Sequence, residues 1–289
     1  MTGDPEFEAL RPQLLRLAYS QLGSLAEAED VVQEAWLRLQ RTDRAAIANL
    51  RAWLTTVVGR LALDELRSAR VRRERYVGTW LPEPVVEPAS PEPDPADRVT
   101  LDESVSHALL VVLESLSPAE RTAFVLHDVF GYAFDEVAEV VGRTPASARQ
   151  LASRARRHIS EQRPRYPATH EEQRRVIEAF FAAAREGDMD GLVALLDPDV
   201  VMRSDGGGLV AASRKPLVGV DRVSRAVAAL TRTGLARAEE LRMVDVNGAP
   251  GLLAIEASGT KTVASFTVDA GRIVAIDIVR NPEKLRHVR

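Results

Sequence analysis

The chain has 289 residues, of which 45% are hydrophobic and 28% charged, and its formal net charge is −4. This length and composition are typical of a globular protein with two or three domains, and the slightly acidic balance excludes any argument for nucleic-acid binding from overall basicity. The chain contains no cysteine, which excludes disulfides, thiol redox chemistry and cysteine-ligated zinc.

Residues 1–77 are predicted to form a first helical domain. One apolar stripe ends at Gly23, and Ser24 to Glu27 has the pattern of a capping box that begins a second helix. From Leu25 to Leu39 apolar residues recur three and four positions apart, which predicts one packed face and one free face. A polar connection over 41–49 precedes a long helix from Leu50 to about Arg75. The free face of the second helix carries Asp30, Gln33, Glu34 and Arg38.

Residues 78–100 are predicted to be an acidic, proline-rich linker. Six prolines lie at positions 82, 84, 88, 91, 93 and 95, so neither a regular helix nor a central strand is expected there. The segments on either side are basic: residues 51–75 and residues 143–165 each contain seven arginines. The charge is therefore unevenly distributed, with two basic patches on either side of an acidic segment.

Residues 101–165 are predicted to be a second helical domain that ends in a helix-turn-helix. Apolar residues recur at i, i+3, i+4 and i+7 from Phe134 to Val141, Gly142 allows a tight turn, and Thr144 caps the next helix with Pro145 at its first position. This second helix buries an apolar stripe and turns its arginines toward solvent, as a recognition helix in a DNA major groove does. Its exposed polar residues are Arg149, Gln150, Ser153, Arg154, Arg156 and Arg157.

Residues 170–289 are predicted to form an α+β domain. Helical patterns cover 171–186, the stretch around Leu192 to Leu196, and 220–231. Alternating apolar patterns predict strands at 200–203, 240–247, 252–258, 262–269 and 272–279. Turns at Asn247-Gly248 and Ala270-Gly271 are typical of hairpins between such strands.

The two helical domains together resemble the extracytoplasmic-function (ECF) sigma factors of bacterial RNA polymerase, over residues 8–163. The resemblance lies in the segments Ala28 to Leu39, Ala52 to Leu54 with Leu61 to Arg67, and the helix-turn-helix. It implies a factor that directs core RNA polymerase to promoters, binding the duplex −35 element and the melted −10 element.

That resemblance assigns a role to each polar surface. Core polymerase is expected to contact Asp30, Gln33, Glu34 and Arg38. The −10 element is expected to contact Arg41, Asn49, Arg51, Arg60 and Arg67, with 41–49 as the pocket loop for an extruded base. Many family members carry Asn where this chain has Arg60, which leaves the base preference open. The −35 element is expected to contact Arg143, Ser147, Arg149, Gln150, Ser153, Arg154 and Arg157.

The C-terminal domain resembles the SnoaL-like branch of the NTF2-like superfamily, which implies a cone-shaped pocket closed by helices. Three motifs match the sigma factors that carry such a fused domain, and the resemblance implies that they make regulatory contacts that modulate activity. These motifs are Trp80, Leu81, Pro82, Glu83 and Pro84; Asp205, Gly206, Gly207 and Gly208; and Asn281, Pro282, Glu283, Lys284 and Leu285. Three successive glycines also permit positive φ and a close backbone approach, although a plain hairpin turn would use them equally well.

Two other functions stay open at this point. A ligand-responsive helix-turn-helix regulator would leave the first domain unexplained. A cyclase or isomerase fused to a DNA-binding module would need an acid such as Asp205 or Asp277 in an apolar pocket, but no His or Tyr pairs with either in the sequence. We therefore expect no catalytic residues, no metal and no cofactor, and an unidentified small molecule is a further candidate partner for the pocket.

The expected location is the cytoplasm, without a membrane partner. The first residues lack an apolar signal core, and no apolar run approaches the roughly 20 residues that span a bilayer.

Overall fold

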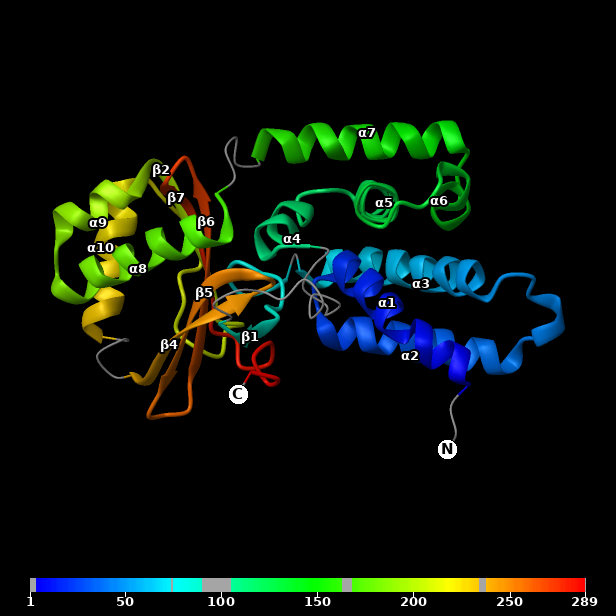
Figure 1. The fold of residues 1–289 in the computed structure, drawn as a ribbon, viewed down its shortest axis with the longest axis horizontal. Helices are drawn as coiled ribbons and strands as arrows, with labels where there is room; N and C mark the ends of the chain where they lie inside the picture. The colour runs from blue at the N-terminus through cyan, green and yellow to red at the C-terminus, as the bar shows by residue number, and fades with distance from the viewer. Residues whose placement is uncertain (1–3, 74, 90–104, 163–167, 234–237, 289) are drawn as a thin grey trace. The chain divides into compact units, whose positions relative to one another are not determined.

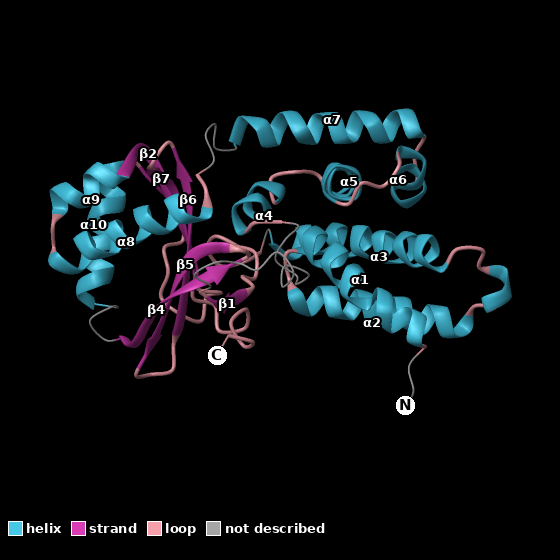
Figure 2. Ribbon diagram, in the orientation of Figure 1, coloured by secondary structure: helices cyan, strands magenta, loops and turns pink. Residues whose placement is uncertain are grey.

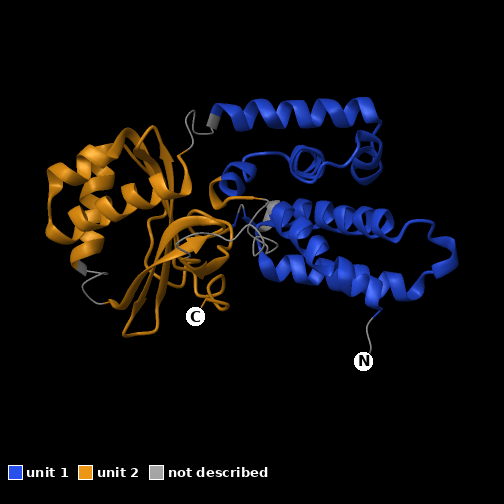
Figure 3. Cartoon of the chain, in the orientation of Figure 1, with its two compact units in different colours: residues 1–75, 109–163 blue, residues 76–108, 164–289 orange. Residues whose placement is uncertain are grey.

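The computed structural model describes residues 4–73, 75–89, 105–162, 168–233 and 238–288 (Figure 1). The chain divides into two compact units, residues 1–75 with 109–163 and residues 76–108 with 164–289 (Figure 3). Figure 2 shows that the first unit is built from helices and the second from a sheet with helices. The predicted fold class, helical domains followed by an α+β domain, is confirmed.

The first unit begins with three helices, α1 (Pro5–Leu22), α2 (Leu25–Arg41) and α3 (Leu50–Arg73), with a 3₁₀ turn η1 (Arg44–Ala46) between the last two. Gly23 ends α1 in the left-handed conformation, at φ 69°, and the Ser24 side chain accepts a hydrogen bond from the Glu27 amide at the start of α2. Both boundaries lie where the sequence predicts them, because they depend on capping chemistry that is local to the chain.

The rest of the first unit comprises α4 (His107–Leu113), α5 (Pro118–Phe124), a π-helical turn η3 (Val125–Val129), α6 (Phe134–Val141) and α7 (Pro145–Gln162). Residues 107 and 108 at the start of α4 belong to the second unit. A capping box of Ser117 and Glu120 begins α5, and Gly142 at φ 66° forms the turn between α6 and α7. The predicted helix-turn-helix is therefore present as α6 and α7.

The two helical domains pack against each other, with α3 against α6. A β-carbon placed on Gly59 would lie 2.9 Å from Val140 Cγ1, so the absence of a side chain allows the close approach of the two helices. Thr122 on α5 also donates a hydrogen bond of 3.0 Å to Gln21 on α1. The first unit is thus one body made from two segments of the sequence.

The second unit contains a seven-stranded sheet in the order β1-β4-β5-β6-β7-β2-β3. Neighbouring strands are antiparallel except β2 and β7, which are parallel. The strands are β1 (Val86–Pro88), β2 (Leu196–Asp205), β3 (Leu217–Val218), β4 (Ala238–Val246), β5 (Ala249–Glu256), β6 (Lys261–Asp269) and β7 (Arg272–Val279).

Three helices cover one face of this sheet: α8 (His170–Glu186), α9 (Met189–Leu195) and α10 (Val220–Thr233) (Figure 1). Side chains alternate between the faces of a strand. Phe266 and Ile276 join the core beneath the helices, whereas the neighbouring Ser265 and Asp277 point the other way. Both faces of the central strands are therefore buried.

The structure differs from the linker expected over 78–100, of which residues 90–100 lie outside the described residues. Residues 76–89, here called the docking segment, belong to the second unit. Val86–Pro88 pairs with β4 as an edge strand, and the Val85 amide donates to Asn247 Oδ1 at 3.1 Å. Proline is compatible with an edge strand, so the proline content restricted the position of this strand without excluding it.

Candidate functional site

The predicted recognition helix, α7, presents its polar residues to solvent. Arg143, Arg149, Gln150, Ser153, Arg154 and Arg157 are exposed, and Ser147 is half-buried. Two of its arginines are held by acids of neighbouring elements: Arg154 Nε lies 2.7 Å from Glu120 Oε1, and Arg156 Nε lies 2.7 Å from Asp128 Oδ1. The Arg149 guanidinium lies 5.2 Å from the centre of the Phe134 ring. Contacts with α5, η3 and α6 thus orient these cations.

The residues predicted to contact the −10 element lie along α3 and the connection that precedes it. Asn49 caps α3 by accepting from the Ala52 amide at 3.1 Å, and Arg51 donates to Gln13 Oε1. Arg67 pairs with Asp64 at 2.9 Å, and Arg41 is exposed at the end of α2. Arg41, Asn49, Arg51 and Arg67 are all exposed, but Arg51 and Arg67 lie on different sides of α3.

Arg60 is an exception, because it points toward α6. Its terminal nitrogen donates to the Glu139 carbonyl oxygen at 3.0 Å and to Glu139 Oε1 at 3.3 Å. The cation predicted to bind the −10 strand is therefore engaged by the helix-turn-helix in this arrangement of the first unit.

The predicted polymerase-binding face of α2 is a polar surface above a regular apolar seam. Asp30 and Gln33 are exposed, and Glu34 and Arg38 form an i,i+4 ion pair of 2.9 Å. Ala28, Val31, Val32, Ala35 and Leu39 beneath them are buried. The helix thus separates a packing face from a free face, as its spacing predicts.

The motifs predicted to make regulatory contacts meet in the second unit at Asp205, whose side chain is fully buried. Its carboxylate accepts from Tyr76 OH at 2.5 Å, the Leu81 amide at 2.9 Å and the Gly207 amide at 3.0 Å, and pairs with Lys284 Nζ at 2.7 Å. One acid thus joins the docking segment, the glycine loop and the C-terminal motif. We call Tyr76, Asp205, Asn281 and Lys284 the docking cluster.

Aromatic side chains of the docking segment complete this cluster. Lys284 Nζ lies 3.9 Å from the centre of the Trp80 ring, within cation–π range, and also donates to the Leu81 carbonyl. Asn281 Nδ2 donates to Tyr76 OH at 2.8 Å. Burial and the hydrogen bond to Asp205 raise the pKa of Tyr76, which keeps its hydroxyl protonated as a donor.

The glycine loop approaches the C-terminal motif closely. Gly207 has φ 64°, and a β-carbon there would lie 2.5 Å from Asn281 Nδ2. A side chain at this position would collide with the amide that binds Tyr76. The close approach permitted by three successive glycines is thus used at Gly207.

A buried histidine fixes the far end of the connection between the two helical domains. The Nε2 of His107 lies 3.2 Å from the Pro82 carbonyl oxygen, and its Nδ1 lies 2.8 Å from Ser265 Oγ. A carbonyl only accepts, so Nε2 carries the proton and Nδ1 accepts from Ser265. Burial lowers the pKa of His107, which favours this neutral form.

The two acids considered for catalysis are engaged by cations outside the apolar pocket of the second unit. Asp205 binds Lys284, and Asp277 binds Arg203 at 2.6 Å. Neither lines the pocket, whose described lining contains one carboxylate, Glu256, paired with Arg280 at 2.7 Å. Within the described residues, no group of three or more histidines and acids is arranged to hold a metal ion.

Sequence reasoning missed Tyr76, His107, Arg280 and Tyr132. Tyr132 OH lies 2.9 Å from Thr55 Oγ1 and accepts from Gln13 Nε2 at 3.2 Å, so it connects the two helical domains. Each of these residues acts through partners more than 15 positions away in the chain, and a local pattern carries no signal for such contacts.

Comparisons with known proteins agree with this architecture. Residues 7–72 match the family model of Sigma-70 region 2, and residues 106–159 match that of Sigma-70 region 4. The ECF RNA polymerase sigma factor SigJ of Mycobacterium tuberculosis is 44% identical over 96% of this chain and 92% of its own length. The probable ECF RNA polymerase sigma factor SigI of the same species is 38% identical over 98% of this chain and 94% of its own length.

The crystal structure of M. tuberculosis SigJ superimposes with a TM-score of 0.78 at 41% identity and covers 97% of both chains. The family resemblance expected from the helical motifs is therefore confirmed over nearly the whole length. Among the described helices, none combines the length and apolarity needed to cross a membrane.

Proposed function

The chain belongs to the extracytoplasmic-function sigma factors of RNA polymerase, and from this premise we propose that its first unit reads a two-part promoter while its second unit modulates that reading. The observation that carries the proposal is the position of the docking segment, which connects the two promoter-reading domains and is bound by the second unit at Asp205.

Promoter reading is assigned to two cationic surfaces of the first unit. Arg149, Gln150, Ser153 and Arg154 on α7 offer donors for base edges of the −35 duplex, and Arg143, Arg156 and Arg157 bind its phosphates. Ser147 also contacts this duplex. Arg51, Arg60 and Arg67 on α3, together with Arg41 and Asn49, bind the melted −10 strand. Asp30, Gln33, Glu34 and Arg38 on α2 bind core polymerase.

The contact between Arg60 and Glu139 implies a conformational change if Arg60 binds the −10 strand. Binding of a DNA strand by this guanidinium competes with its contact to Glu139, and we propose that α3 and α6 separate when the −10 element binds. Separation also allows the two domains to reach elements that are spaced along the promoter. The second unit can then affect their separation, because it binds the connection between them.

Modulation through the docking cluster requires no chemical catalysis. The support is that Asp205 and Asp277, the acids a proton-transfer mechanism would use, are both paired with cations away from the pocket. We therefore propose a regulatory second unit without enzymatic activity, in a cytoplasmic protein that works with the polymerase.

Run-off transcription with purified core RNA polymerase tests this function. The intact chain is expected to start transcripts from a promoter with separated −35 and −10 elements. A Lys284→Met variant, which weakens the docking cluster, is expected to change the yield without moving the start site. Arg286→Met is the matched control, because Arg286 lies two residues away and is exposed.

Failure of every variant to direct core polymerase would overturn promoter reading, and sequence-specific DNA binding without core enzyme would favour a helix-turn-helix regulator instead. Equal yields from the wild type and a folded Lys284→Met variant would overturn the modulating role of the second unit.

A further inference from the structure

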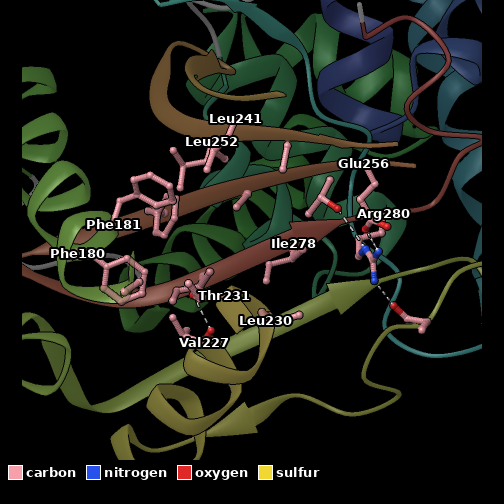
Figure 4. A pocket seen from close by; sticks show the side chains of 17 residues that line it. Phe180, Phe181, Val227, Leu230, Thr231, Leu241, Leu252, Glu256, Ile278 and Arg280 are labelled. Carbon is pink, nitrogen blue, oxygen red and sulfur yellow. Dashed lines mark hydrogen bonds and ion pairs between the residues drawn. The ribbon is translucent and has the colours of Figure 1, made fainter. Parts of the chain in front are cut away.

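The second unit contains a partly open apolar cavity of about 330 Å³ between α8, α10 and the sheet (Figure 4). Phe180, Phe181, Leu230 and Ile278 are among the side chains that line it. The volume is at the lower end of the range for small-molecule pockets. Water gains little in a cavity with such walls, whereas an apolar molecule of matching size removes its own surface from water.

One end of the cavity is polar. Arg280 donates through Nε to Thr262 Oγ1 at 3.1 Å, and through its terminal nitrogens to the Ala211 carbonyl at 2.8 Å and to Glu256 Oε1 at 2.7 Å. Each terminal nitrogen carries a second N–H, and the Thr262 hydroxyl keeps its own O–H to donate. This end can therefore give hydrogen bonds to an acceptor atom of a ligand.

The balanced charge at the polar end of the cavity favours an uncharged ligand. Arg280 and Glu256 neutralise each other, and the rest of the described lining carries no ionisable side chain. An anionic or cationic ligand would bring an unbalanced charge into an apolar cavity, which costs free energy. An uncharged acceptor such as a carbonyl oxygen meets the two kinds of donor without that cost.

We propose that this cavity binds an uncharged, mainly apolar molecule with one acceptor oxygen held by Arg280 and Thr262, and that its occupancy is transmitted to the docking cluster. The binding half of the proposal stands on the cavity alone, and the transmission half rests on the proposed modulating function.

The route of transmission is a single step along the backbone. Arg280 points into the cavity, while Asn281, the next residue, donates to Tyr76 OH in the docking cluster. The amides of both residues donate to the Asp205 carbonyl oxygen, at 2.7 and 3.0 Å. A ligand that repositions Arg280 therefore acts on a peptide segment whose next side chain holds the docking segment.

Three matched naphthalenes test the binding half on the intact chain by isothermal titration calorimetry. The ketone 2-acetylnaphthalene is expected to bind most tightly. 2-Ethylnaphthalene, which lacks the acceptor oxygen, is expected to bind at least about tenfold more weakly, as the loss of a hydrogen bond from a charged donor predicts. The anion 2-naphthoate is expected to bind more weakly than the ketone. Equal affinity for all three, or no binding of any, would overturn the proposal.

Two substitutions place the ketone in this cavity. Thr262→Val removes the hydroxyl at nearly constant volume and is expected to weaken ketone binding about fivefold while leaving 2-ethylnaphthalene unchanged. The matched control is Thr267→Val on the same strand, where the side chain does not line the cavity. Ala264→Phe fills the cavity and is expected to abolish binding, with its unfolding curve showing that it folds. Unchanged ketone affinity in folded Thr262→Val and Ala264→Phe would overturn the site.

Fluorine NMR of the chain labelled with 5-fluorotryptophan tests transmission. Trp80 lies against Lys284 outside the cavity lining, and Trp36 and Trp53, the other two tryptophans, belong to the first unit. Saturation with 2-acetylnaphthalene is expected to shift the Trp80 resonance and to leave the other two in place. Binding without a Trp80 shift would overturn transmission, and because no transcription is measured, this result is independent of the test of the proposed function.

Discussion

The Asp205 carboxylate lies fully buried and depends on Lys284 for its opposite charge. Removing one partner of a buried ion pair is costly because the other charge stays in the protein interior. We expect Lys284→Met, which keeps most of the apolar stem, to lower the free energy of unfolding of the second unit by about 3 kcal/mol in urea denaturation. Arg286→Met, whose exposed partner Glu283 is 3.9 Å away, is expected to cause no measurable change, and an equal effect of both substitutions would contradict this role of Lys284.

The buried His107 gives the second unit a dependence on pH with a defined sign. Its pKa is lower in the folded chain than in the unfolded chain, so the unfolded chain takes up the proton first as the pH falls. Its stabilising contribution is complete above the unfolded value, about pH 6.5, and is lost on further acidification by up to about 1.4 kcal/mol per pH unit.

His107→Gln isolates this contribution, because an amide can donate to Pro82 and accept from Ser265 without titrating. We expect the stability of the variant to fall less steeply than that of the wild type between pH 6.5 and 5. Parallel stability curves for the two proteins would show that His107 does not titrate in this range.

Arg149 and Arg156 lie on α7 in different surroundings, and their expected effects differ. Arg149 lies over Phe134, whereas Arg156 is held by Asp128, and we propose that Arg156 binds a phosphate. Arg149→Ala is expected to cost about 1–3 kcal/mol of discrimination at particular −35 bases. Arg156→Ala is expected to weaken binding of all −35 sequences alike. Competition between promoter variants in polymerase holoenzyme assays distinguishes the two outcomes, and uniform losses for both would reassign Arg149 to the phosphates.

At the level of whole elements, the contact of α3 with α6 can be locked covalently. The ideal β-carbon of residue 59 lies 3.7 Å from Val140 Cβ, close to the usual separation of about 3.8 Å in a disulfide, and the natural chain has no cysteine to interfere. Gly59→Cys with Val140→Cys is expected to form this bond under oxidation. We expect the oxidised protein to lose run-off transcription and the reduced protein to regain it, because the proposed binding of the −10 strand separates α3 from α6.

Each single cysteine variant, treated with the same oxidant, is the control for that lock. Full transcription by the oxidised double variant would show that α3 and α6 can stay together during initiation.

The elements also show how far the sequence could be interpreted. Capping residues and apolar spacing predicted α1, α2, the helix-turn-helix and the five longer strands, because these signals are local. The strand β1 was missed, because three residues take an extended form there only through pairing with Val244 to Val246. The candidate site follows the same division: exposed arginines were found from helical spacing, whereas the engagement of Arg60 by Glu139 and the convergence on Asp205 depend on tertiary contacts.

For the whole molecule, the division into units predicts what truncation does. A chain ending before Glu171 keeps the docking segment but loses the sheet that buries Leu81 and Val85. Exposed apolar side chains next to an unpaired edge strand favour association. We expect this truncated chain to self-associate in light scattering more than the intact chain, and Leu81→Ser with Val85→Ser is expected to restore a monomer. A truncated chain that is monomeric without these changes would contradict the burial of these residues by the second unit.

The contact of His107 with Pro82 affects how far apart the two DNA-reading domains can lie, in a protein that reads two sites on one DNA molecule. Between the end of α3 at Arg73 and the start of α4 at His107 the chain has 33 residues, a tether that could reach roughly 110 Å if fully extended. Because Pro82 and His107 are both attached to the same sheet, the chain between these two residues cannot extend. The part of the tether that remains between the two DNA-reading domains is therefore short. We therefore expect undocking from the sheet to change the range of promoter spacings that the factor accepts as well as its affinity for promoters.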